Sequence, residues 1–387
     1  MKKKIVGILI ILLIIVSSIF LFCNKKEKTI NNMTLREKIG QMLMVYYTLD
    51  EVDDDLINTL KTNQPGGFII TGDNLKEYNR TKKFITSLNK YTDIDMIIAV
   101  DQEGGSVQRL SDIEDKKATV IPHGYEIGAL NDLDVSYNIG KIISSEAASI
   151  GCNAVFSPVC DIGDYESSAM GKRLLSNDTN IVVNNSYQIY KGIKDNGLLS
   201  IPKHFPGIGD TSSDTHYDDL SIIDKTKEEL YENELKPFIK LINEGAKMIM
   251  VGHAVYPKVT NDDIPASLSK TIVTDILINE LKFDGIVITD AVNMGALSYK
   301  YNEETIYTEA INAGVNMFIM PNGSKRVIDI IEECVKKGTI DEEKINESVR
   351  RILKVKKSIK TKKINNFGSF QNKKYICDHF KNYCNVK

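Results

Sequence analysis

Eight short apolar runs, separated by longer amphipathic segments, set the strongest limit on how this chain can fold. Each run is four or five residues long, and polar residues do not alternate with the apolar ones inside it. Short runs of this kind, rich in β-branched residues, are typical of strands that are buried on both faces. The runs are Gln41–Val45, Gly67–Ile70, Met96–Val100, Ala154–Pro158, Leu199–Pro202, Met248–Val251, Gly285–Thr289 and Met317–Met320.

The segments between these runs have the apolar spacing of amphipathic helices. Clear examples are Leu75–Lys90, Asp134–Ile150, Ile181–Asn196, Lys225–Asn243 and Lys270–Leu281. Alternation of strand and helix indicates a parallel sheet. Eight such units over about 330 residues predict an α/β fold, a (β/α)8 TIM-type barrel that forms a single catalytic domain.

Side chains that can handle protons follow five of the eight runs. In this kind of barrel the active site lies at the C-terminal ends of the strands. A structural protein has no reason to place such residues there, so the pattern predicts an enzyme. The residues are Asp101 and Glu103 after the third run, Asp161 after the fourth, Lys203 and His204 after the fifth, His253 after the sixth and Asp290 after the seventh.

The segment that begins at Lys203 and ends at His216 carries the densest chemistry. Asp214 precedes His216 by two residues. A turn between them would let the carboxylate hold one ring nitrogen while the other moves a proton. Gly207 and Gly209 would let this loop swing. If the fold brings the loop to Asp290, the two places supply an acid/base and a nucleophile.

The N-terminus has the pattern of an export signal or a membrane anchor. Three lysines precede an apolar stretch from Ile5 to Phe22, and Cys23 follows it. The stretch is long enough to cross a bilayer. We expect residues 1–23 to be a signal peptide or anchor and 24–33 a linker, with the catalytic part exported. The tether would be a lipidated Cys23 or an uncleaved helix, and a soluble secreted form is the alternative.

Net charge bears on nucleic-acid binding, and the cysteine positions bear on disulfides and zinc sites. The net charge of -3 gives no reason to expect nucleic-acid binding. Cys152 and Cys160 would lie about 26 Å apart along a strand, too far for a disulfide, so both should be buried thiols. Cys377 and Cys384 lie near enough in sequence to bridge in an oxidising compartment. No spacing resembles a zinc site.

The C-terminal part of the chain changes character after Arg350. The sequence becomes basic and helical, and residues 361–387 are rich in Lys, Asn and Tyr. We expect a closing helix followed by a poorly ordered tail. The barrel domain would therefore span residues 34–360.

Several motifs, in their order along the chain, resemble glycoside hydrolase family 3 and, within it, the single-barrel β-N-acetylglucosaminidases. The resemblance covers roughly Thr34 to Val355. The motifs are Asp101–Arg109, Phe156–Asp161, Gly171–Arg173, Lys203–His216, Gly252–Pro257 and Ile288–Ala296. One departure is Leu174-Leu175, where the family usually has Ser-Phe. Family β-glucosidases normally carry a second domain, for which no room remains after Arg350.

The resemblance implies a role for each matched residue. Asp290 matches the nucleophile, which forms a covalent glycosyl-enzyme. His216 matches the general acid/base, and Asp214 its orienting partner. The residues that match the binding site for the terminal sugar are Asp101, Arg109, Arg173, Lys203 and His204. Asp161 and His253 could line the pocket or support it from behind.

The implied activity is that of a retaining exo-β-N-acetylglucosaminidase, which would act on β-linked N-acetylglucosamine in muropeptides or other peptidoglycan fragments without a cofactor or metal. Three other enzyme types stay open: a β-N-acetylglucosaminide phosphorylase, another family 3 β-glycosidase, and a metal-dependent barrel hydrolase that uses Asp210, Asp214, His204 and His216. A sugar-binding lipoprotein without catalysis is the non-enzymatic alternative. The oligomeric state is left open.

Overall fold

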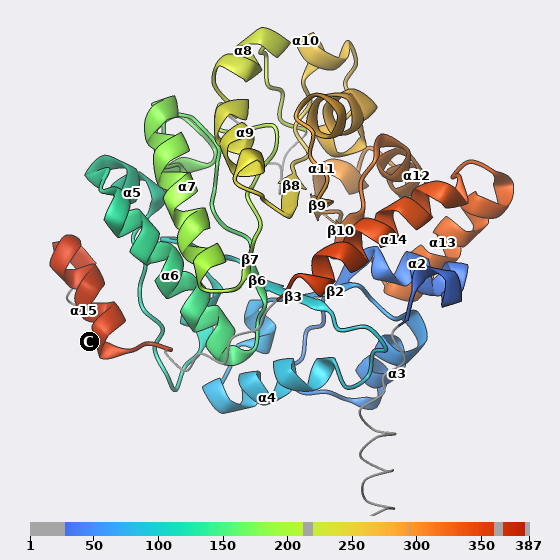
Figure 1. Cartoon of the computed structure of the whole chain (residues 1–387), viewed down its shortest axis with the longest axis horizontal. Helices are drawn as coiled ribbons and strands as arrows, with labels where there is room; N and C mark the ends of the chain where they lie inside the picture. Colours follow the sequence, from blue (N-terminus) through green and yellow to red (C-terminus); the bar gives the residue numbers. More distant parts are fainter. Residues whose placement is uncertain (1–27, 212–219, 294, 360–366, 384–387) are drawn as a thin grey trace, which may run out of the picture.

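Eight parallel strands form the centre of the molecule (Figure 1). The computed structural model describes residues 28–211, 220–293, 295–359 and 367–383. The strands are β1 (Leu43–Val45), β2 (Gly67–Ile70), β3 (Ile97–Val100), β6 (Ala154–Val155), β7 (Leu199–Ser200), β8 (Met248–Val251), β9 (Ile286–Ala291) and β10 (Met317–Ile319). They follow the order β7-β6-β3-β2-β1-β10-β9-β8. Each predicted apolar run overlaps one of them, so the barrel prediction is confirmed.

The chain just beyond β7 closes the barrel. The amide of Phe205 donates to the carbonyl of Met250 at 2.8 Å, and the amide of Gly252 donates to the carbonyl of Phe205 at 3.0 Å. These bonds pair the segment around Phe205, which follows β7, with β8. The segment that carries Lys203 and His204 is therefore fixed within the barrel wall.

Helices surround the strands on the outside (Figure 1). They are α2 (Leu35–Gln41), α3 (Asp54–Asn63), α4 (Tyr78–Leu88), α5 (Gly124–Leu130), α6 (Leu133–Ile150), α7 (Thr179–Asp195), α8 (Lys227–Glu232), α9 (Leu235–Asn243), α10 (Pro257–Thr260), α11 (Gly295–Ser298), α12 (Glu303–Ala313), α13 (Ser324–Lys337) and α14 (Glu342–Lys357), with α15 (Phe370–His379) at the C-terminal end. A π-helix spans Thr271–Glu280. Short 3-10 turns lie at Ile30–Asn32, Gly72–Asn74, Arg109–Asp112, Gly171–Arg173, Ala266–Leu268 and Lys381–Tyr383.

Local sequence signals explain where these helices begin and end. Asp132 caps α6 by accepting from the amides of Asp134 and Val135, and Gly151 ends that helix with a φ of 109°. The predicted single helix over Lys225–Asn243 is wrong in one respect. It divides into α8 and α9 because Asn233 leaves the helical region, with φ of -131° and ψ of -80°.

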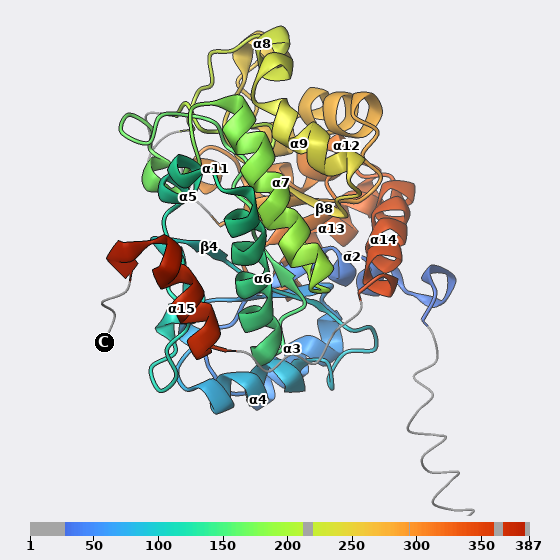
Figure 2. The same cartoon turned by 60° about the vertical axis from the view of Figure 1, so that its left-hand side comes forward.

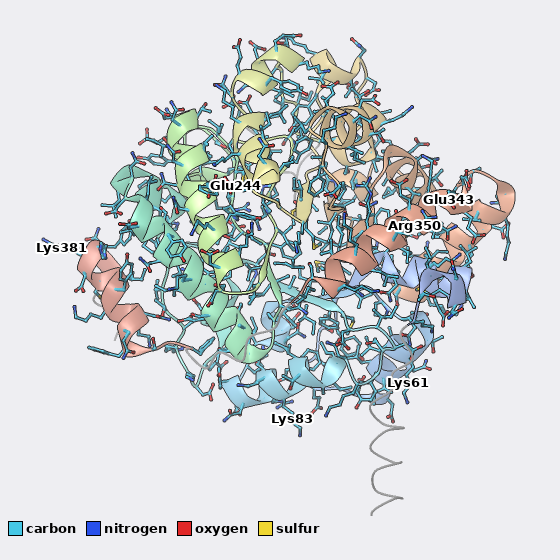
Figure 3. All side chains as sticks on the ribbon, in the orientation of Figure 1. Lys61, Lys83, Glu244, Glu343, Arg350 and Lys381 are labelled. Atoms are coloured by element: carbon cyan, nitrogen blue, oxygen red, sulfur yellow. The ribbon has the colours of Figure 1, made fainter. Side chains whose placement is uncertain are left out.

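Exposed lysines such as Lys61, Lys83 and Lys381 lie on the periphery (Figure 3). Cys152 and Cys160 are buried thiols, as predicted. The predicted bridge from Cys377 to Cys384 involves a residue outside the described part of the chain.

Within the described residues, no helix combines the length and the apolar character needed to cross a membrane.

The C-terminal segment differs from the predicted disordered tail, because residues 367–383 include α15 and pack on α6 (Figure 2). The contact is built on Glu146, whose side chain is almost fully buried. Its carboxylate accepts from the Thr119 hydroxyl at 2.5 Å and from the Gly368 amide at 3.0 Å. Burial raises the pKa of Glu146, and these donors oppose the rise only in part.

Replacing Glu146 with alanine should lower the free energy of unfolding by about 3 kcal/mol, because buried donors lose their acceptor and a cavity forms. Urea denaturation measures the loss. The matched control is Glu244→Ala, which removes a surface carboxylate that pairs with Lys240 four residues earlier and should leave the free energy of unfolding nearly unchanged. Equal small losses for the two variants would mean that Glu146 does not anchor this segment.

Candidate active site

A buried carboxylate, Glu103, holds two cations at the mouth of the barrel. Its two oxygens accept from Nη2 and Nε of Arg173, each at 2.8 Å. Lys203 Nζ lies 2.5 Å from Glu103 and 2.6 Å from Asp101. Burial acts to raise the pKa of Glu103, but Arg173 and Lys203 outweigh it and hold that pKa well below its usual range. The cluster therefore stays charged, with all three side chains fixed by their partners.

The hairpin that carries Glu103 is formed by β4 (Gln102–Gly104) and β5 (Val107–Gln108). Glycine is required at its turn. Gly105 has a φ of +55°, and a Cβ there would lie 2.0 Å from the ring of His123. The Gly-Gly pair after Glu103 thus lets the chain fold back and place the carboxylate inward.

His204 is oriented by a second buried carboxylate. Its Nδ1 lies 2.7 Å from Asp161, which also accepts from the amide of Ile208 at 2.8 Å. This pairing puts the proton of a neutral ring on Nδ1 and leaves Nε2 facing the site. Nε2 is 3.5 Å from Arg173 Nη2 and 3.9 Å from Asp290. The sequence left open whether Asp161 lines the pocket or supports it from behind. In the structure its carboxylate holds His204.

Asp290 lies near the end of β9, and its side chain is 21% exposed. Its Oδ1 accepts from the amide of Ala291 at 2.7 Å. Burial acts to raise the pKa of Asp290, but His204, His253, the amide of Ala291 and Lys203 together outweigh it, so that the pKa is lowered. The carboxylate is therefore ionised at neutral pH and partly accessible, as a nucleophile must be.

His253 lies behind Asp290. Its Nδ1 is 2.8 Å from the hydroxyl of Ser267, and its Nε2 is 3.3 Å from the carbonyl of Ala291. Burial lowers the pKa of His253. A neutral ring held in this way fixes the backbone next to Asp290.

The structure thus brings together five of the residues that the sequence singled out: Asp101, Arg173, Lys203, His204 and Asp290. Arg109 is not joined to them through its side chain. That side chain is exposed and makes no hydrogen bond or ion pair with another described residue, while its amide donates to the carbonyl of Asp101 at 3.3 Å. The predicted sugar contact of Arg109 stays a prediction.

Asp214 and His216 lie outside the described residues, so their predicted dyad stays a prediction too. The residues on either side of this gap are described. Lys225 pairs with both Asp210 and Glu234, which ties the chain after the gap to the chain before it and to the residue that precedes α9. The amide of Ile223 donates to the carbonyl of Val255 at 2.9 Å.

The sequence left open whether Arg173 binds sugar or forms a structural pair with Glu103 or Asp161, and the structure shows the pair with Glu103. Glu103 follows Asp101 by two residues, and a doubled acidic residue beside two predicted cations indicates an ion-pair centre. No group of histidine, cysteine and acidic side chains among the described residues has the arrangement of a metal site.

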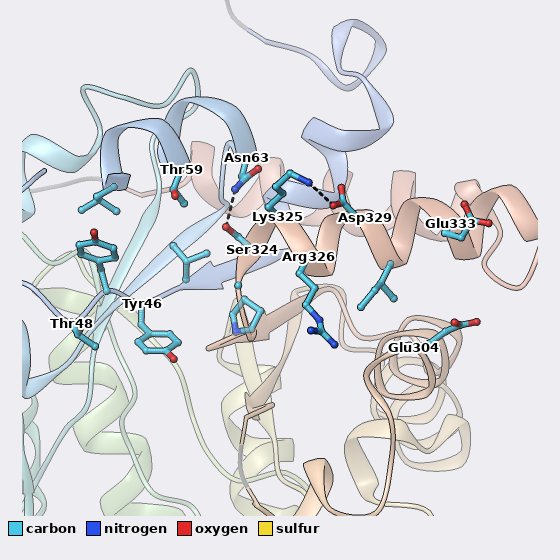
Figure 4. Close-up of a pocket in the computed structure, with 16 residues that line it drawn as sticks. Tyr46, Thr48, Thr59, Asn63, Glu304, Ser324, Lys325, Arg326, Asp329 and Glu333 are labelled. Carbon is cyan, nitrogen blue, oxygen red and sulfur yellow. Dashed lines mark hydrogen bonds and ion pairs between the residues drawn. The ribbon is translucent and has the colours of Figure 1, made fainter. Parts of the chain in front are cut away.

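An open pocket of about 1010 Å³ lies apart from this cluster, between α3 and α13 (Figure 4). It is lined by Tyr46 after β1 and by Pro321 after β10. The five clustered residues do not line it. Its hydrogen bond from Asn63 to Ser324, at 2.9 Å, joins the two helices.

A (β/α)8 barrel with an ionised carboxylate at a strand end, beside cations that can donate to hydroxyls, has the architecture and side chains of a glycosidase. The sequence pattern described as the glycosyl hydrolase family 3 N-terminal domain matches residues 34–355. This chain therefore belongs to glycosyl hydrolase family 3, and the predicted family is confirmed.

Named relatives agree with this assignment. A β-hexosaminidase of Nitrosomonas eutropha is 31% identical over 264 residues, which is 66% of this chain and 74% of that protein. A β-hexosaminidase of Hydrogenovibrio crunogenus is 28% identical over 273 residues, 69% of this chain and 74% of that protein. The solved family 3 β-N-acetylglucosaminidase from Paenibacillus sp. str. FPU-7 matches with a TM-score of 0.83 and 29% identity, covering 90% of this chain and 68% of that one.

Proposed function

We propose that this protein is a retaining exo-β-N-acetylglucosaminidase that removes terminal N-acetylglucosamine from peptidoglycan fragments such as muropeptides. The observation that carries the proposal is the placement of Asp290, held ionised 3.9 Å from His204 at the edge of the Glu103 cluster. The names of the relatives support the choice of sugar. The test is turnover of an aryl β-N-acetylglucosaminide.

The cluster would bind the terminal sugar from its non-reducing side. Asp101 would accept from sugar hydroxyls, while Arg173 and Lys203 donate to hydroxyl oxygens with charge-assisted strength. The acetamido carbonyl needs a donor as well, and the cationic side chains can supply it. Because these groups are buried and already paired, they need little reorganisation when the sugar arrives.

In the first chemical step an oxygen of Asp290 attacks the anomeric carbon, and the bond from that carbon to the leaving oxygen breaks. His216 gives its proton to the leaving oxygen, which departs as a hydroxyl. In the second step His216 takes a proton from water, the water oxygen attacks the same carbon, and the ester to Asp290 breaks. Two inversions retain the β configuration.

Replacing His216 with alanine should slow oligosaccharides far more than activated aryl glycosides, because an alkoxide leaving group needs the proton and a nitrophenolate does not. We expect a loss of about 100-fold or more on the former, measured as kcat/KM on a disaccharide and on a nitrophenyl glycoside. Exposed His379 offers the matched control, His379→Ala. Equal losses on both substrates would argue against the acid role.

Hydrolysis without a metal separates this proposal from the metal-dependent alternative. We expect full activity after exhaustive treatment with EDTA and after dialysis into metal-free buffer, because the proposed chemistry uses only carboxylate and imidazole groups. Restoration of lost activity by added zinc would favour the metal-dependent hydrolase. Phosphorolysis is distinguished in the same assay, since a phosphorylase would release the sugar 1-phosphate when phosphate is present.

We also propose that the enzyme is exported and tethered to the membrane by a lipidated Cys23 or an uncleaved N-terminal helix. The support is the sequence alone: three lysines, the apolar stretch over residues 5–22 and the cysteine that follows it. Metabolic labelling with a fatty acid tests the lipid. Label in the wild type that is absent from Cys23→Ser would support it.

A further inference from the structure

A buried serine, Ser267, is bonded to His253 and takes no part in the steps of the proposed mechanism. Its hydroxyl oxygen lies 2.8 Å from Nδ1 of His253. Ser267 is fully buried, and His253 is 2% exposed. The backbone brings the two together, because the amide of Ser267 donates to the carbonyl of Gly252 at 3.2 Å. The amide of Ala266 also donates to the carbonyl of Ala254 at 2.8 Å. The segment after α10 is thus paired with the segment after β8, which fixes Ser267 opposite His253.

The partners of His253 determine which ring nitrogen carries the proton. Nε2 lies 3.3 Å from the carbonyl oxygen of Ala291, which can only accept. In a neutral ring Nε2 therefore carries the proton, and Nδ1 accepts from the hydroxyl of Ser267. Burial lowers the pKa of His253 against the opposing effect of Asp290, which favours the neutral ring at neutral pH.

The peptide unit that joins Ala291 to Val292, just beyond the nucleophile, is held from both sides of β9. His253 comes from the segment after β8, the strand on one side of β9, and binds the carbonyl of Ala291. On the other side, the amide of Val292 donates to the carbonyl of Ile319 on β10 at 3.0 Å. A rotation of this peptide unit would therefore break at least one of the two bonds.

The orientation of this peptide unit decides how the carboxylate of Asp290 is presented. The amide of Ala291 donates to Oδ1 of Asp290 at 2.7 Å. The other oxygen, Oδ2, lies 3.9 Å from Nε2 of His204 in the site. Oδ1 is thus engaged by the backbone, and Oδ2 is the oxygen left for attack on the anomeric carbon.

We propose that Ser267 and His253 are positioning residues, which hold Asp290 with Oδ1 bound to the backbone and Oδ2 directed at the sugar. The inference rests on the proposed function, in which Asp290 forms the covalent glycosyl-enzyme. Neither side chain reaches the reacting atoms, because both are buried. Their loss should slow formation of the covalent bond and leave binding of the sugar by the Glu103 cluster unchanged.

Two substitutions of His253 separate the hydrogen bond from the packing. In His253→Gln the amide nitrogen stands the same number of bonds from Cα as Nε2 of the ring, so it can donate to the carbonyl of Ala291. His253→Leu fills similar space without a donor. The covalent step is measured as inactivation by 5-fluoro-N-acetylglucosaminyl fluoride, which yields a rate constant at saturation and a dissociation constant.

We expect His253→Leu to lower the saturating rate constant about 10- to 100-fold, because the nucleophile loses its alignment. The dissociation constant should change less than about twofold, and His253→Gln should recover most of the rate. Ser267→Ala, which leaves His253 in place, should lower the rate about three- to tenfold. The matched control is Ser136→Ala, whose fully buried hydroxyl donates to Asn185 at 2.7 Å between α6 and α7. It should change neither constant.

A second measurement is independent of activity. In protein labelled with ¹⁵N-histidine, long-range ¹⁵N–¹H spectra distinguish the two neutral tautomers from each other and from the charged ring, and the signal missing from His253→Gln identifies His253. We predict the tautomer protonated on Nε2 at pH 7.

The inference would be overturned by a proton on Nδ1 or a charged ring, by His253→Gln reacting as slowly as His253→Leu, or by Ser267→Ala reacting as fast as the wild type. A weaker dissociation constant at an unchanged rate would overturn it as well. The proposed function fails separately, if the wild type neither cleaves an N-acetylglucosaminide nor reacts with the fluoride.

Discussion

Replacing Asp290 with alanine is expected to lower kcat on every N-acetylglucosaminide by at least about four orders of magnitude. The covalent route is lost with this carboxylate, and no other described acidic side chain lies at the end of β9 facing His204. The fold should survive, because among the described residues Asp290 accepts a hydrogen bond from the adjacent amide of Ala291 alone. The unfolding free energy measured in urea should therefore change little.

Two further measurements make this prediction specific. Asp284→Ala is the matched control, because Asp284 lies just before the other end of β9 and is 80% exposed beside Lys354. It should retain normal turnover. A 5-fluoro glycosyl fluoride should trap the glycosyl-enzyme, and mass spectrometry of the digest should place the added sugar on the peptide that contains Asp290. Sugar on another carboxylate would contradict the assignment.

Replacing Glu103 with glutamine is expected to reduce both stability and activity. The change leaves Arg173 without its carboxylate partner, and Lys203 with Asp101 alone, in a site where Glu103 is only 6% exposed. Breaking a buried pair by removing one member costs about 3 kcal/mol or more. Released cations would also misplace the sugar, so kcat/KM should fall by at least about 100-fold.

The pH dependence separates this effect from a simple packing loss. The pKa of Glu103 is held below its ordinary 4.5 in the folded state, so its stabilisation is full above pH 4.5 and is lost as the pH falls below that value. The difference in unfolding free energy between wild type and Glu103→Gln should shrink by about 2 kcal/mol from pH 7 to pH 3. A constant difference would contradict the ion-pair explanation. Glu343→Gln, at an exposed pair with Arg350, should leave the free energy of unfolding nearly unchanged at either pH.

Much of the fold could be predicted because buried parallel strands leave an unambiguous pattern. A run such as Met248–Val251 is apolar on both faces, and its strand has the same bounds in the structure. The break between α8 and α9 could not be predicted, since it depends on the backbone of one residue, Asn233. The ordered structure of residues 367–383 could not be predicted for another reason. It depends on Glu146, more than two hundred residues away in the sequence.

The candidate site could be predicted where residues follow strands directly. Asp101, Lys203 and Asp290 occupy strand ends, so the barrel itself brings them to one mouth. The pair between Arg173 and Glu103 was one of several possible pairings, and the sequence could not choose among them because the two residues lie 70 positions apart. The orientation of His204 likewise depends on Asp161, 43 positions away. The choice of these partners depends on the closed barrel, which brings distant positions of the sequence together.

The central claim is that the barrel mouth cleaves β-linked N-acetylglucosamine. The most direct measurement is the rate at which the purified full-length protein releases the aryl group from three glycosides: the β-N-acetylglucosaminide, the β-glucoside and the β-xyloside. We predict turnover of the N-acetylglucosaminide, lost in Asp290→Ala, with little or none of the other two. Turnover of the glucoside or the xyloside in its place, or of none of the three, would contradict the account.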